Sequence, residues 1–291
     1  MAIPSAYLNL WAEHPSTEKA KNTYQRFKEI AEIIYGSKIE IYLQGSYAND
    51  TNIKGESDVD IVLCFPDVVV DRTLGGYTFF QPNYSLRVSD LRDEVFNKIN
   101  HKFNFSLTKG SKTIKYAGND YYLPVDLVPC GRYSGVAIGD NGTAIYDHDD
   151  GRTYVNYPKL HIKNSETKNG RCSGNYKKTV RMFKHAKEKL LEKHLLSYSS
   201  TAPSYFVECL IYNAPDHLFV RDNYDSFLNV LNWLNQNKYK LSDLKCPNGK
   251  HYLFNEGFVS FEKQYVYKRW NTSDAKKFID ALVDLWQYWG K

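Results

Sequence analysis

The sequence predicts an α+β protein whose first half mixes strands with helices and whose second half is helical. Three observations support this prediction. Up to residue 128, short apolar segments with strand character alternate with two helical patterns. From Gly174 onward, apolar residues recur at helical spacing in four segments. The charge is also divided, because the first half is acidic and the second half is basic.

Each element of the first half is predicted from its own local pattern. Ser16 or Thr17 can cap a helix that ends at Gly36. The segment IEIYLQ alternates apolar and polar residues like a half-buried strand, whereas DVDIVLCF is β-branched and apolar like a buried one. The turn sequence AGND separates two further strands. The predicted elements are a helix over residues 16–35, strands over 39–44 and 58–65, a helix over 89–103, and strands over 112–116 and 121–128.

The second half is predicted to begin with loops and to continue with helices. Residues 135–172 are rich in Gly, Asn and Asp, which are typical of connecting loops. Pro203 fits the first position of a helix. The apolar residues Ile279, Leu282, Val283, Trp286 and Trp289 recur at helical spacing, which favours core packing over a base-stacking platform. The predicted helices span residues 175–194, 203–214, 223–237 and 272–289.

The composition excludes several classes of protein. The chain has 291 residues, and its 42% hydrophobic and 15% aromatic content can fill a core and is too high for a disordered chain. No apolar run approaches the roughly 18 residues of a membrane span, and the start MAIPSAYLNLWAEHP lacks the features of a secretory signal. Five scattered cysteines support neither a disulfide framework nor a zinc site. We therefore expect a cytoplasmic protein with reduced thiols and no membrane partner.

The net charge of +5 hides an uneven distribution. Residues 1–150 contain 15 Lys and Arg and 20 Asp and Glu, a net charge of −5, whereas residues 151–291 contain 23 and 13, a net charge of +10. An acidic half joined to a basic half suggests metal ligands on one side and groups that bind an anion on the other.

Three aspartates of the first half are candidate metal ligands. Asp58 and Asp60 are two residues apart at the start of a predicted strand, so both carboxylates point to the same face and repel each other. Asp126 lies within a second apolar strand, where a charge is costly to bury without a partner. If the two strands are neighbours, the three carboxylates converge. Hard oxygen ligands without His or Cys nearby suit Mg²⁺ or Mn²⁺, and two such ions can hold the attacking and leaving oxygens of a phosphoryl transfer.

Gly45 and Ser46 lie at the end of the first predicted strand, before Asp58. A glycine there lets the backbone approach a ligand closely, and a serine with exposed N–H groups at a helix start can hold a phosphate. Taken singly, a Gly-Ser turn, an acidic pair or one Asp in a strand is more typical of ordinary structure. Their order along the chain favours a functional site.

This order of residues resembles a known family. The segment LQGSYANDTNIKGESDVDIVLCF, followed by a third Asp on a later strand, is similar to the signature of the polymerase-β-like nucleotidyltransferase superfamily. The match is to the branch that contains cyclic GMP-AMP synthase, oligoadenylate synthase and the bacterial cGAS/DncV-like nucleotidyltransferases of antiphage signalling, and it fits the bacterial members best. The motifs lie in residues 41–65 and 121–130, and the α/β-then-helical layout extends the resemblance over nearly the whole chain.

The resemblance implies roles for the residues of the first half. The metal ligands and catalytic residues would be Asp58 and Asp60, which would bind two Mg²⁺ ions. Asp126 would bind one of these ions and help to activate the attacking ribose hydroxyl. The nucleotide would be bound by Gln44, Gly45 and Ser46, with the last two at the donor triphosphate.

A basic helix in the second half provides candidate cations. Residues 171–193 contain eight Lys and Arg, and Lys177, Arg181 and Lys184 share one helical face. A triphosphate clamp, a solvated basic face and a nucleic-acid surface are the alternatives for this helix.

In the family, a lysine on a helix of the second domain and a Ser-Tyr pair on the next helix meet the donor nucleotide, and VRMFKHAK and PSYFVECL stand in these places. The resemblance thus places Lys184 and Ser204 at the phosphates and Tyr205 against a base, with a place in the core as the alternative for Tyr205. The animal member of the family has a zinc-containing insertion for DNA sensing, which this chain lacks, so nucleic acid is not expected to be required.

These observations together predict a two-lobed nucleotidyltransferase with its active site in the cleft between the lobes. Residues 1–165 would form the catalytic lobe with a mixed sheet and an N-terminal helix, and residues 166–291 a helical nucleotide-binding lobe like that of oligoadenylate synthase. The enzyme is expected to use ATP, GTP or other NTPs with Mg²⁺ or Mn²⁺ and to release pyrophosphate. Its product would be a cyclic di- or trinucleotide that activates a downstream effector in antiphage (CBASS) signalling.

Two further functions remain open at this point. The first is a linear oligonucleotide synthase, or an enzyme that transfers a nucleotide to RNA or to a small molecule. The second is an inactive scaffold that binds nucleotides or nucleic acid.

Overall fold

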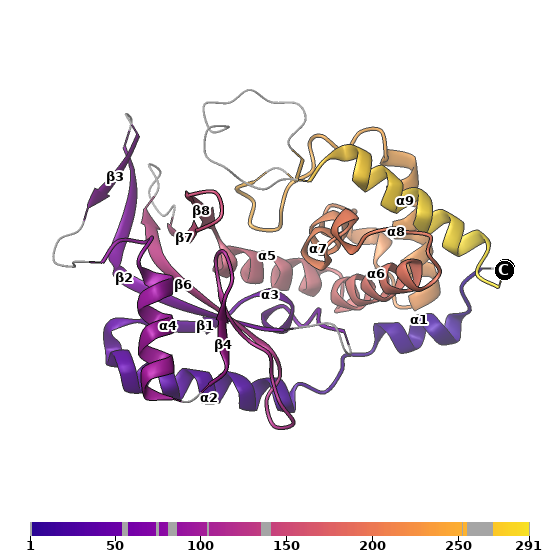
Figure 1. Cartoon of the computed structure of the whole chain (residues 1–291). Helices are drawn as coiled ribbons and strands as arrows, with labels where there is room; N and C mark the ends of the chain where they lie inside the picture. The colour runs from indigo at the N-terminus through magenta and orange to yellow at the C-terminus, as the bar shows by residue number, and fades with distance from the viewer. Residues whose placement is uncertain are drawn as a thin grey trace.

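The computed structural model of the chain describes residues 2–53, 58–73, 76–80, 86–103, 105–134, 141–251, 253–254 and 270–290. Within these residues, a half built on one mixed β-sheet lies beside a helical half (Figure 1). The α+β class that the sequence predicts, with a sheet-containing half before a helical half, is confirmed.

One sheet forms the framework of the first half. Its strands are β1 (Glu40–Leu43), β2 (Val59–Thr73), β3 (Gly76–Phe80), β4 (Leu107–Lys109), β5 (Ile114–Tyr116), β6 (Val125–Ser134), β7 (Asn141–Asp147) and β8 (Arg152–Asn156). The order across the sheet is β1-β2-β6-β5-β4, with β3 paired to β2 and with β7 between β6 and β8. The pair β2–β6 is parallel and the other pairs of the described residues are antiparallel, so the sheet is mixed.

Helices form the remaining part of both halves. They are α1 (Ser5–Ala12), α2 (Glu18–Tyr35), α3 (Gly45–Ala48), α4 (Leu91–Lys102), α5 (Pro158–Arg171), α6 (Asn175–Glu192), α7 (Ser204–Tyr212), α8 (Asn223–Asn237) and α9 (Thr272–Gln287). Short 3₁₀ turns lie at Gly36–Lys38, Ser199–Thr201 and Asp216–Leu218. The helices predicted over 16–35, 89–103, 175–194, 203–214, 223–237 and 272–289 correspond to α2, α4, α6, α7, α8 and α9.

The strand predicted over residues 58–65 is longer than expected, because β2 continues to Thr73. Pro66 lies within it, and the register of β2 against β6 shifts between Phe65 and Val69. Proline cannot donate to the hydrogen-bond ladder of a sheet, and a bulge lets the strand pass such a residue. Pro66 therefore lies at an irregularity inside the strand and does not end it.

Residues 135–172 do not form the loops that the sequence predicts. Residues 135–140 lie outside the described residues, but the rest of the segment forms β7, β8 and α5. Helix α5 escaped prediction because the residues that it buries are polar, namely His161, Ser165 and Lys168, so it shows no apolar periodicity. Pro203, which was expected at the first helical position, instead precedes α7 in an extended conformation.

The sheet has two different faces. Val59, Ile61 and Leu63 of β2 pack into a core with α2 and α4, which cover one side of the sheet (Figure 1). Because side chains alternate along a strand, Asp60 lies on the opposite face, together with Val62. The acidic pair of the central strands therefore points away from α2 and α4.

The helical half has its own core around α6, which packs against α7, α8 and α9. Helix α1, which the sequence did not predict, belongs to this core although it comes from the start of the chain. It has only eight residues and no side-chain cap, so its stability comes from burying Leu8 and Trp11. The predicted lobe boundary between residues 165 and 166 falls inside α5 and stays a prediction.

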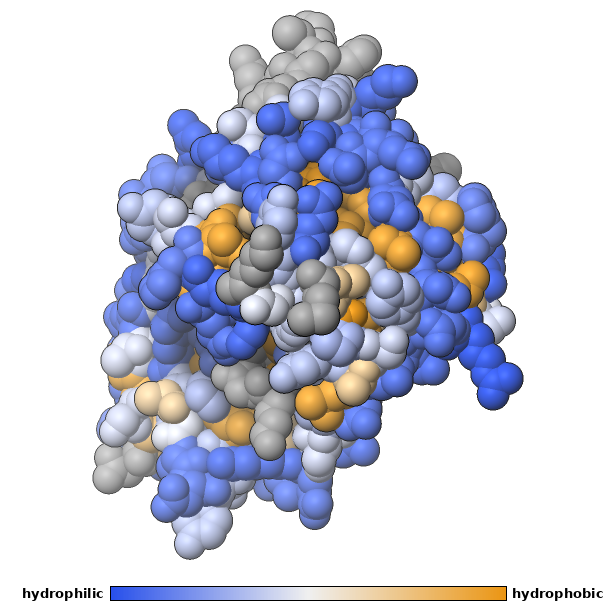
Figure 2. Space-filling model, turned by 90° about the vertical axis from the view of Figure 1, so that its right-hand side faces the viewer, coloured by the Kyte–Doolittle hydropathy of each residue, from blue (hydrophilic) through white to orange (hydrophobic). Residues whose placement is uncertain are grey.

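The side of the molecule on which α1 and α9 lie is mostly hydrophilic, with small, separate apolar spots (Figure 2). The exposed apolar side chains on these elements include Leu10 and Tyr7 of α1. None of the helices in the described ranges has the length and apolar content that crossing a lipid bilayer requires.

We predict that Phe27→Ala destabilises the protein by about 3–5 kcal/mol, because it leaves a cavity between α2 and the sheet. Phe27 is 1% exposed, and its ring lies 5.4 Å from that of Phe105 and 5.5 Å from that of Tyr116. The matched control is Ile33→Ala on the same helix, where the side chain is 57% exposed and the expected change is within about 0.5 kcal/mol. Urea unfolding measures both changes, and equal effects would contradict this account of the core.

Candidate active site

The parallel pairing of β2 with β6 brings two of the predicted aspartates side by side. In the register of these strands, Asp60 is the direct partner of Asp126. Asp58 is exposed immediately before β2. All three line one cavity of about 230 Å³, here called the acidic cavity. Its lining residues are Gly45, Ser46, Asp58, Asp60, Asp126, Lys184, Ser204, Tyr205 and Glu208.

Gly45 lies against the carboxylate of Asp60. A Cβ atom at this glycine would be 2.2 Å from Oδ2 of Asp60, and the glycine adopts φ +70°, which other residues rarely do. The preceding amide N–H, that of Gln44, donates a hydrogen bond of 3.0 Å to the carbonyl oxygen of Asp60. Only glycine fits here, so the turn and the acid are held in contact, as the order of the motif suggested.

The acidic cavity is electrostatically unfavourable without a bound cation. Burial, followed by the negative charges of Asp126 and Asp58, raises the pKa of Asp60 to about 7. Burial also raises the pKa of Asp126, although Lys115, whose Nζ is 3.5 Å from Oδ1, opposes the shift. Oδ1 of Asp126 has no hydrogen-bond partner among the described residues.

These observations fit a divalent cation by the chemistry of the donors. The cavity offers carboxylate oxygens, which Mg²⁺ and Mn²⁺ prefer, and positive charge would relieve the repulsion that raises the pKa of Asp60. In the described part of the chain, no three His, Cys, Asp or Glu side chains are gathered tightly enough to hold a metal ion. The fit thus rests on the donor set and not on a closed cage of ligands.

A second cavity of about 270 Å³, here called the side cavity, adjoins the acidic cavity. Both cavities are lined by Gly45, Asp60 and Tyr205. The remaining lining residues of the side cavity are Gln44, Asn49, Asn156, Tyr157, Pro158, His161, Ile162 and Asn248.

The Tyr205 side chain has two different ends. The residue is 44% exposed, so part of its ring is open to a ligand. Its hydroxyl is turned inward, 3.3 Å from Nδ1 of His161. This exposure does not match the alternative of a residue fully enclosed in the core, and the stacking of Tyr205 on a base stays a prediction.

The basic face of α6 is buried and not solvated. Lys177, Arg181 and Lys184 are each less than 9% exposed. Arg181 donates a hydrogen bond of 2.6 Å to the carbonyl oxygen of Asp50, and Lys177 is 3.1 Å from Oδ2 of the same residue. The three cations therefore bind Asp50 and Thr51, which follow α3.

Lys184 lines the acidic cavity, but its ammonium group contacts protein atoms. Its Nζ lies 3.0 Å from the carbonyl oxygen of Thr51, 3.1 Å from Oγ1 of Thr51 and 3.4 Å from Oε2 of Glu208. An ammonium group has three donors, and three acceptors already surround this one. Its predicted contact with a triphosphate stays a prediction, and Lys187, whose Nζ donates to Oγ of Ser204 at 3.0 Å, is a second cation at this edge.

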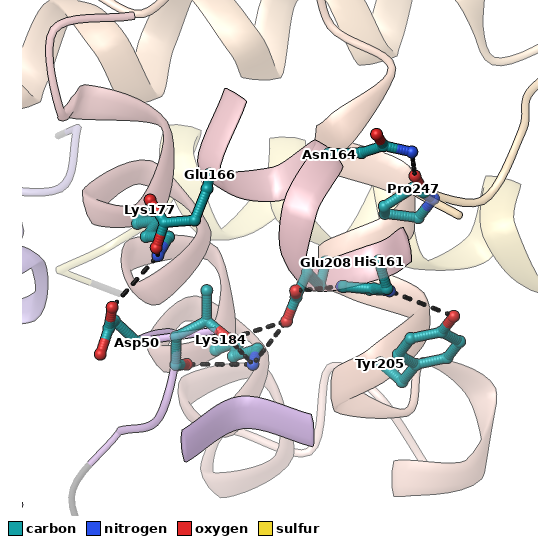
Figure 3. A network of polar contacts seen from close by, with 10 residues as sticks. Asp50, His161, Asn164, Glu166, Lys177, Lys184, Tyr205, Glu208 and Pro247 are labelled. Carbon is teal, nitrogen blue, oxygen red and sulfur yellow. Dashed lines mark hydrogen bonds and ion pairs between the residues drawn. The ribbon is translucent and has the colours of Figure 1, made fainter. Parts of the chain in front are cut away.

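Sequence reasoning missed Glu208 and His161, which Figure 3 shows in contact, and Thr51, which completes a buried polar cluster with them. Burial alone would raise the pKa of Glu208, but the charge of Lys184 and hydrogen bonds from His161 and Thr51 outweigh it and lower the pKa to about 2. The sequence did contain a signal for Glu208, because it is the one acidic residue within the apolar helix SYFVECLIY, where a charge requires a buried partner.

The sheet, the Gly-Ser turn and the paired aspartates define a nucleotidyltransferase. Comparison with known proteins agrees with this class. A profile of the nucleotidyltransferase domain matches residues 24–134, and a profile of the cGAS/DncV-like nucleotidyltransferase C-terminal helical domain matches residues 163–287. The cyclic UMP-AMP synthase of Rhodothermus marinus is 34% identical over 100% of both chains, and a cyclic nucleotide synthase of Staphylococcus haemolyticus is 31% identical over 99% of this chain and 100% of that one.

A solved structure extends this similarity to three dimensions. The structure of the Rhodothermus marinus c-UMP-AMP synthase with Apcpp and Upnpp superimposes with a TM-score of 0.85, at 33% identity, over 99% of this chain and 98% of that one. The chain belongs to the cGAS/DncV-like nucleotidyltransferase family, and it is a nucleotidyltransferase whose relatives are named as cyclic nucleotide synthases.

We predict that Asp60→Asn stabilises the metal-free protein. Because the pKa of Asp60 is about 7 in the folded chain and lower in the unfolded chain, the charged carboxylate opposes folding above pH 7, and this cost disappears as the pH falls toward 4. In EDTA at pH 8, the variant should gain on the order of 1–4 kcal/mol in unfolding free energy, and less at pH 5. Asp67→Asn, at an exposed position of the same strand, is the control and should change little.

We predict the opposite pH dependence for Glu208→Gln. The pKa of Glu208 is depressed in the folded chain, so its charge stabilises the fold above about pH 4.5, and this stability is lost as the pH falls toward 2. The variant should be less stable by about 3 kcal/mol at pH 7, and the difference should shrink below pH 4.5. Urea unfolding across this range tests the prediction, with Glu192→Gln as the exposed control. A difference that stays constant with pH would contradict it.

Proposed function

We propose that this enzyme uses a divalent cation, Mg²⁺ or alternatively Mn²⁺, to join two or three nucleoside triphosphates into a cyclic oligonucleotide, with release of pyrophosphate. The observation that carries the proposal is the direct pairing of Asp60 with Asp126 beside Gly45 in one cavity. The full-length similarity to cyclic nucleotide synthases supports the same reaction.

The residues of the acidic cavity have distinct tasks in this proposal. Asp58, Asp60 and Asp126 hold the cation, which would neutralise the charge that develops on the triphosphate. Asp126 lines the cavity and would also help to activate the attacking ribose hydroxyl. The contact of Gly45 with Asp60 keeps the Gly-Ser turn, which would bind the triphosphate, next to the three aspartates.

The nucleotide itself would occupy both cavities. Ser46 and Ser204 line the acidic cavity and can donate hydroxyl hydrogen bonds to phosphate oxygens, and Lys187 adds positive charge beside Ser204. The open part of the Tyr205 ring offers a stacking surface for a base in the side cavity. Gln44 lines the side cavity and is a further contact for the nucleotide.

ATP, GTP, UTP and CTP are the candidate substrates, because the names of the relatives differ in their bases. They include a cyclic UMP-AMP synthase, a cyclic GMP-AMP synthase and a cyclic dipyrimidine nucleotide synthase. A product of two NTPs is the simplest reading of these names. Family membership also supports a cytoplasmic role in antiphage (CBASS) signalling through an effector that the product activates, without a requirement for nucleic acid.

The experiment that tests this function incubates the pure protein with all four NTPs and Mg²⁺. We predict pyrophosphate release and a product that resists phosphatase, whose mass gives the two bases and the ring size. Asp60→Asn and Asp126→Asn should each lower the rate by about a hundredfold or more, because they remove charge that holds the cation. EDTA should abolish the reaction.

The control variant is Asp67→Asn, which changes an exposed acid of β2 outside the cavity and should keep the full rate. A phosphatase-sensitive product would indicate a linear oligonucleotide synthase instead. Failure to release pyrophosphate from any pair of NTPs would refute the proposed reaction.

A further inference from the structure

A chain of buried hydrogen bonds joins the side cavity to the acidic cavity (Figure 3). The hydroxyl of Tyr205 lies 3.3 Å from Nδ1 of His161, and Nε2 of His161 lies 2.7 Å from Oε1 of Glu208. The other oxygen of Glu208 accepts a hydrogen bond of 2.7 Å from Oγ1 of Thr51. His161, Glu208 and Thr51 are each at most 4% exposed, so water does not compete for these bonds.

The direction of the donors identifies Glu208 as the acceptor at the centre of this series of hydrogen bonds. An ionised carboxylate only accepts, so Nε2 of His161 must donate to it. Nδ1 of His161 faces the hydroxyl of Tyr205, which donates to a neutral imidazole and accepts from a protonated one. Thr51 and Lys184 donate to Glu208 from the other side. Donors from His161, Thr51 and Lys184 therefore converge on this one carboxylate.

The series of hydrogen bonds continues through the backbone of Thr51 to the Gly-Ser turn. The amide N–H of Thr51 donates a hydrogen bond of 3.0 Å to the carbonyl oxygen of Ser46. Lys184 also holds the carbonyl oxygen of Thr51 at 3.0 Å. A shift of Thr51 would therefore move Ser46, which lines the acidic cavity.

We infer that Glu208 is a positioning residue that fixes the Tyr205 ring relative to the turn at Ser46, with His161 and Thr51 as its two arms. The two ends of the chain are the proposed base-stacking ring and the proposed phosphate-binding turn, so they would contact opposite ends of one nucleotide. Since hydrogen-bonded networks couple energetically, a loss at either end should weaken the same binding event. This inference rests on the proposed function, because it requires the nucleotide to span both cavities.

The test is a double-mutant cycle at the two ends of the chain. Tyr205→Phe removes the hydroxyl and keeps the ring, and Thr51→Val removes the other hydroxyl and keeps the shape. The probes are the α,β-methylene analogues of the four NTPs, and the tightest-binding analogue is measured by calorimetry with Mg²⁺. Each variant should weaken binding by about fivefold to tenfold, and the double variant by no more than the larger single effect.

Inorganic tripolyphosphate provides the readout that a purely structural role would not change. Tripolyphosphate would bind at the Ser46 turn and has no base. Tyr205→Phe should therefore leave its affinity unchanged, and the coupling between Tyr205→Phe and Thr51→Val should disappear. Thr51→Ser, which keeps the hydroxyl, should restore analogue binding to within about twofold of the unmodified protein. Thr179→Val removes an equally buried hydroxyl from α6, outside the chain, and should combine with Tyr205→Phe as the product of the two single effects.

Each outcome decides the inference. Three results would overturn it: fold-changes of Tyr205→Phe and Thr51→Val that multiply in the double variant, coupling that persists with tripolyphosphate, or a Thr51→Ser variant that binds as weakly as Thr51→Val. In each of these cases, loss of activity in Asp60→Asn would still uphold the proposed function. If no analogue binds to the unmodified protein, the proposed function fails and the inference fails with it.

Discussion

The parallel pairing of β2 with β6 determines where the other residues of the acidic cavity lie. It places Asp60 and Asp126 directly beside each other, and it requires a long connection between the two strands. That connection forms α4 and the hairpin partner β5, whose Lys115 lies opposite Asp126. On the other side of β2, the antiparallel strand β1 ends next to Asp60, so that its final turn delivers Gly45 to the carboxylate. Both neighbours of β2 therefore direct their functional residues to one point.

The arrangement brings carboxylates close enough to repel one another, and the cations of the helical half do not offset this repulsion. The buried cations of α6 are engaged by Glu208 and by the segment that follows α3, so they hold backbone in place and leave the aspartates largely uncompensated. Active sites commonly retain such unfavourable charge because the ligand relieves it. A divalent cation would supply the positive charge that the cavity lacks, and it could then hold the polyanionic nucleotide beside the carboxylates.

Most of the fold and the acidic part of the site could be predicted from the sequence, because both depend on local patterns. Asp58, Asp60 and Asp126 stand out as charges at apolar strands, and Gly45 as a break at a strand end. Helix α5 could not be predicted because it buries polar side chains, and α1 could not because its stability comes from a distant core. His161 and Thr51 escaped for the same reason, since their partner Glu208 is far away in the sequence and only tertiary packing brings them together. The basic face of α6 was recognised, but its burial and its protein partners depend on the segment at Asp50, which carries no local signal.

The position of α1 has a mechanical consequence. This helix packs in the helical core, whereas α2, only a few residues later, packs against the sheet. Within the described residues, the chain thus passes between the two cores near residues 13–17 and again near α5. These two passages of the chain and the contacts of the α6 cations with Asp50 and Thr51 together hold the two halves in place. Arg181 ties the first of these passages to the segment after α3, because its guanidinium group binds the last carbonyl oxygen of α1 and the carbonyl oxygen of Asp50 at the same time.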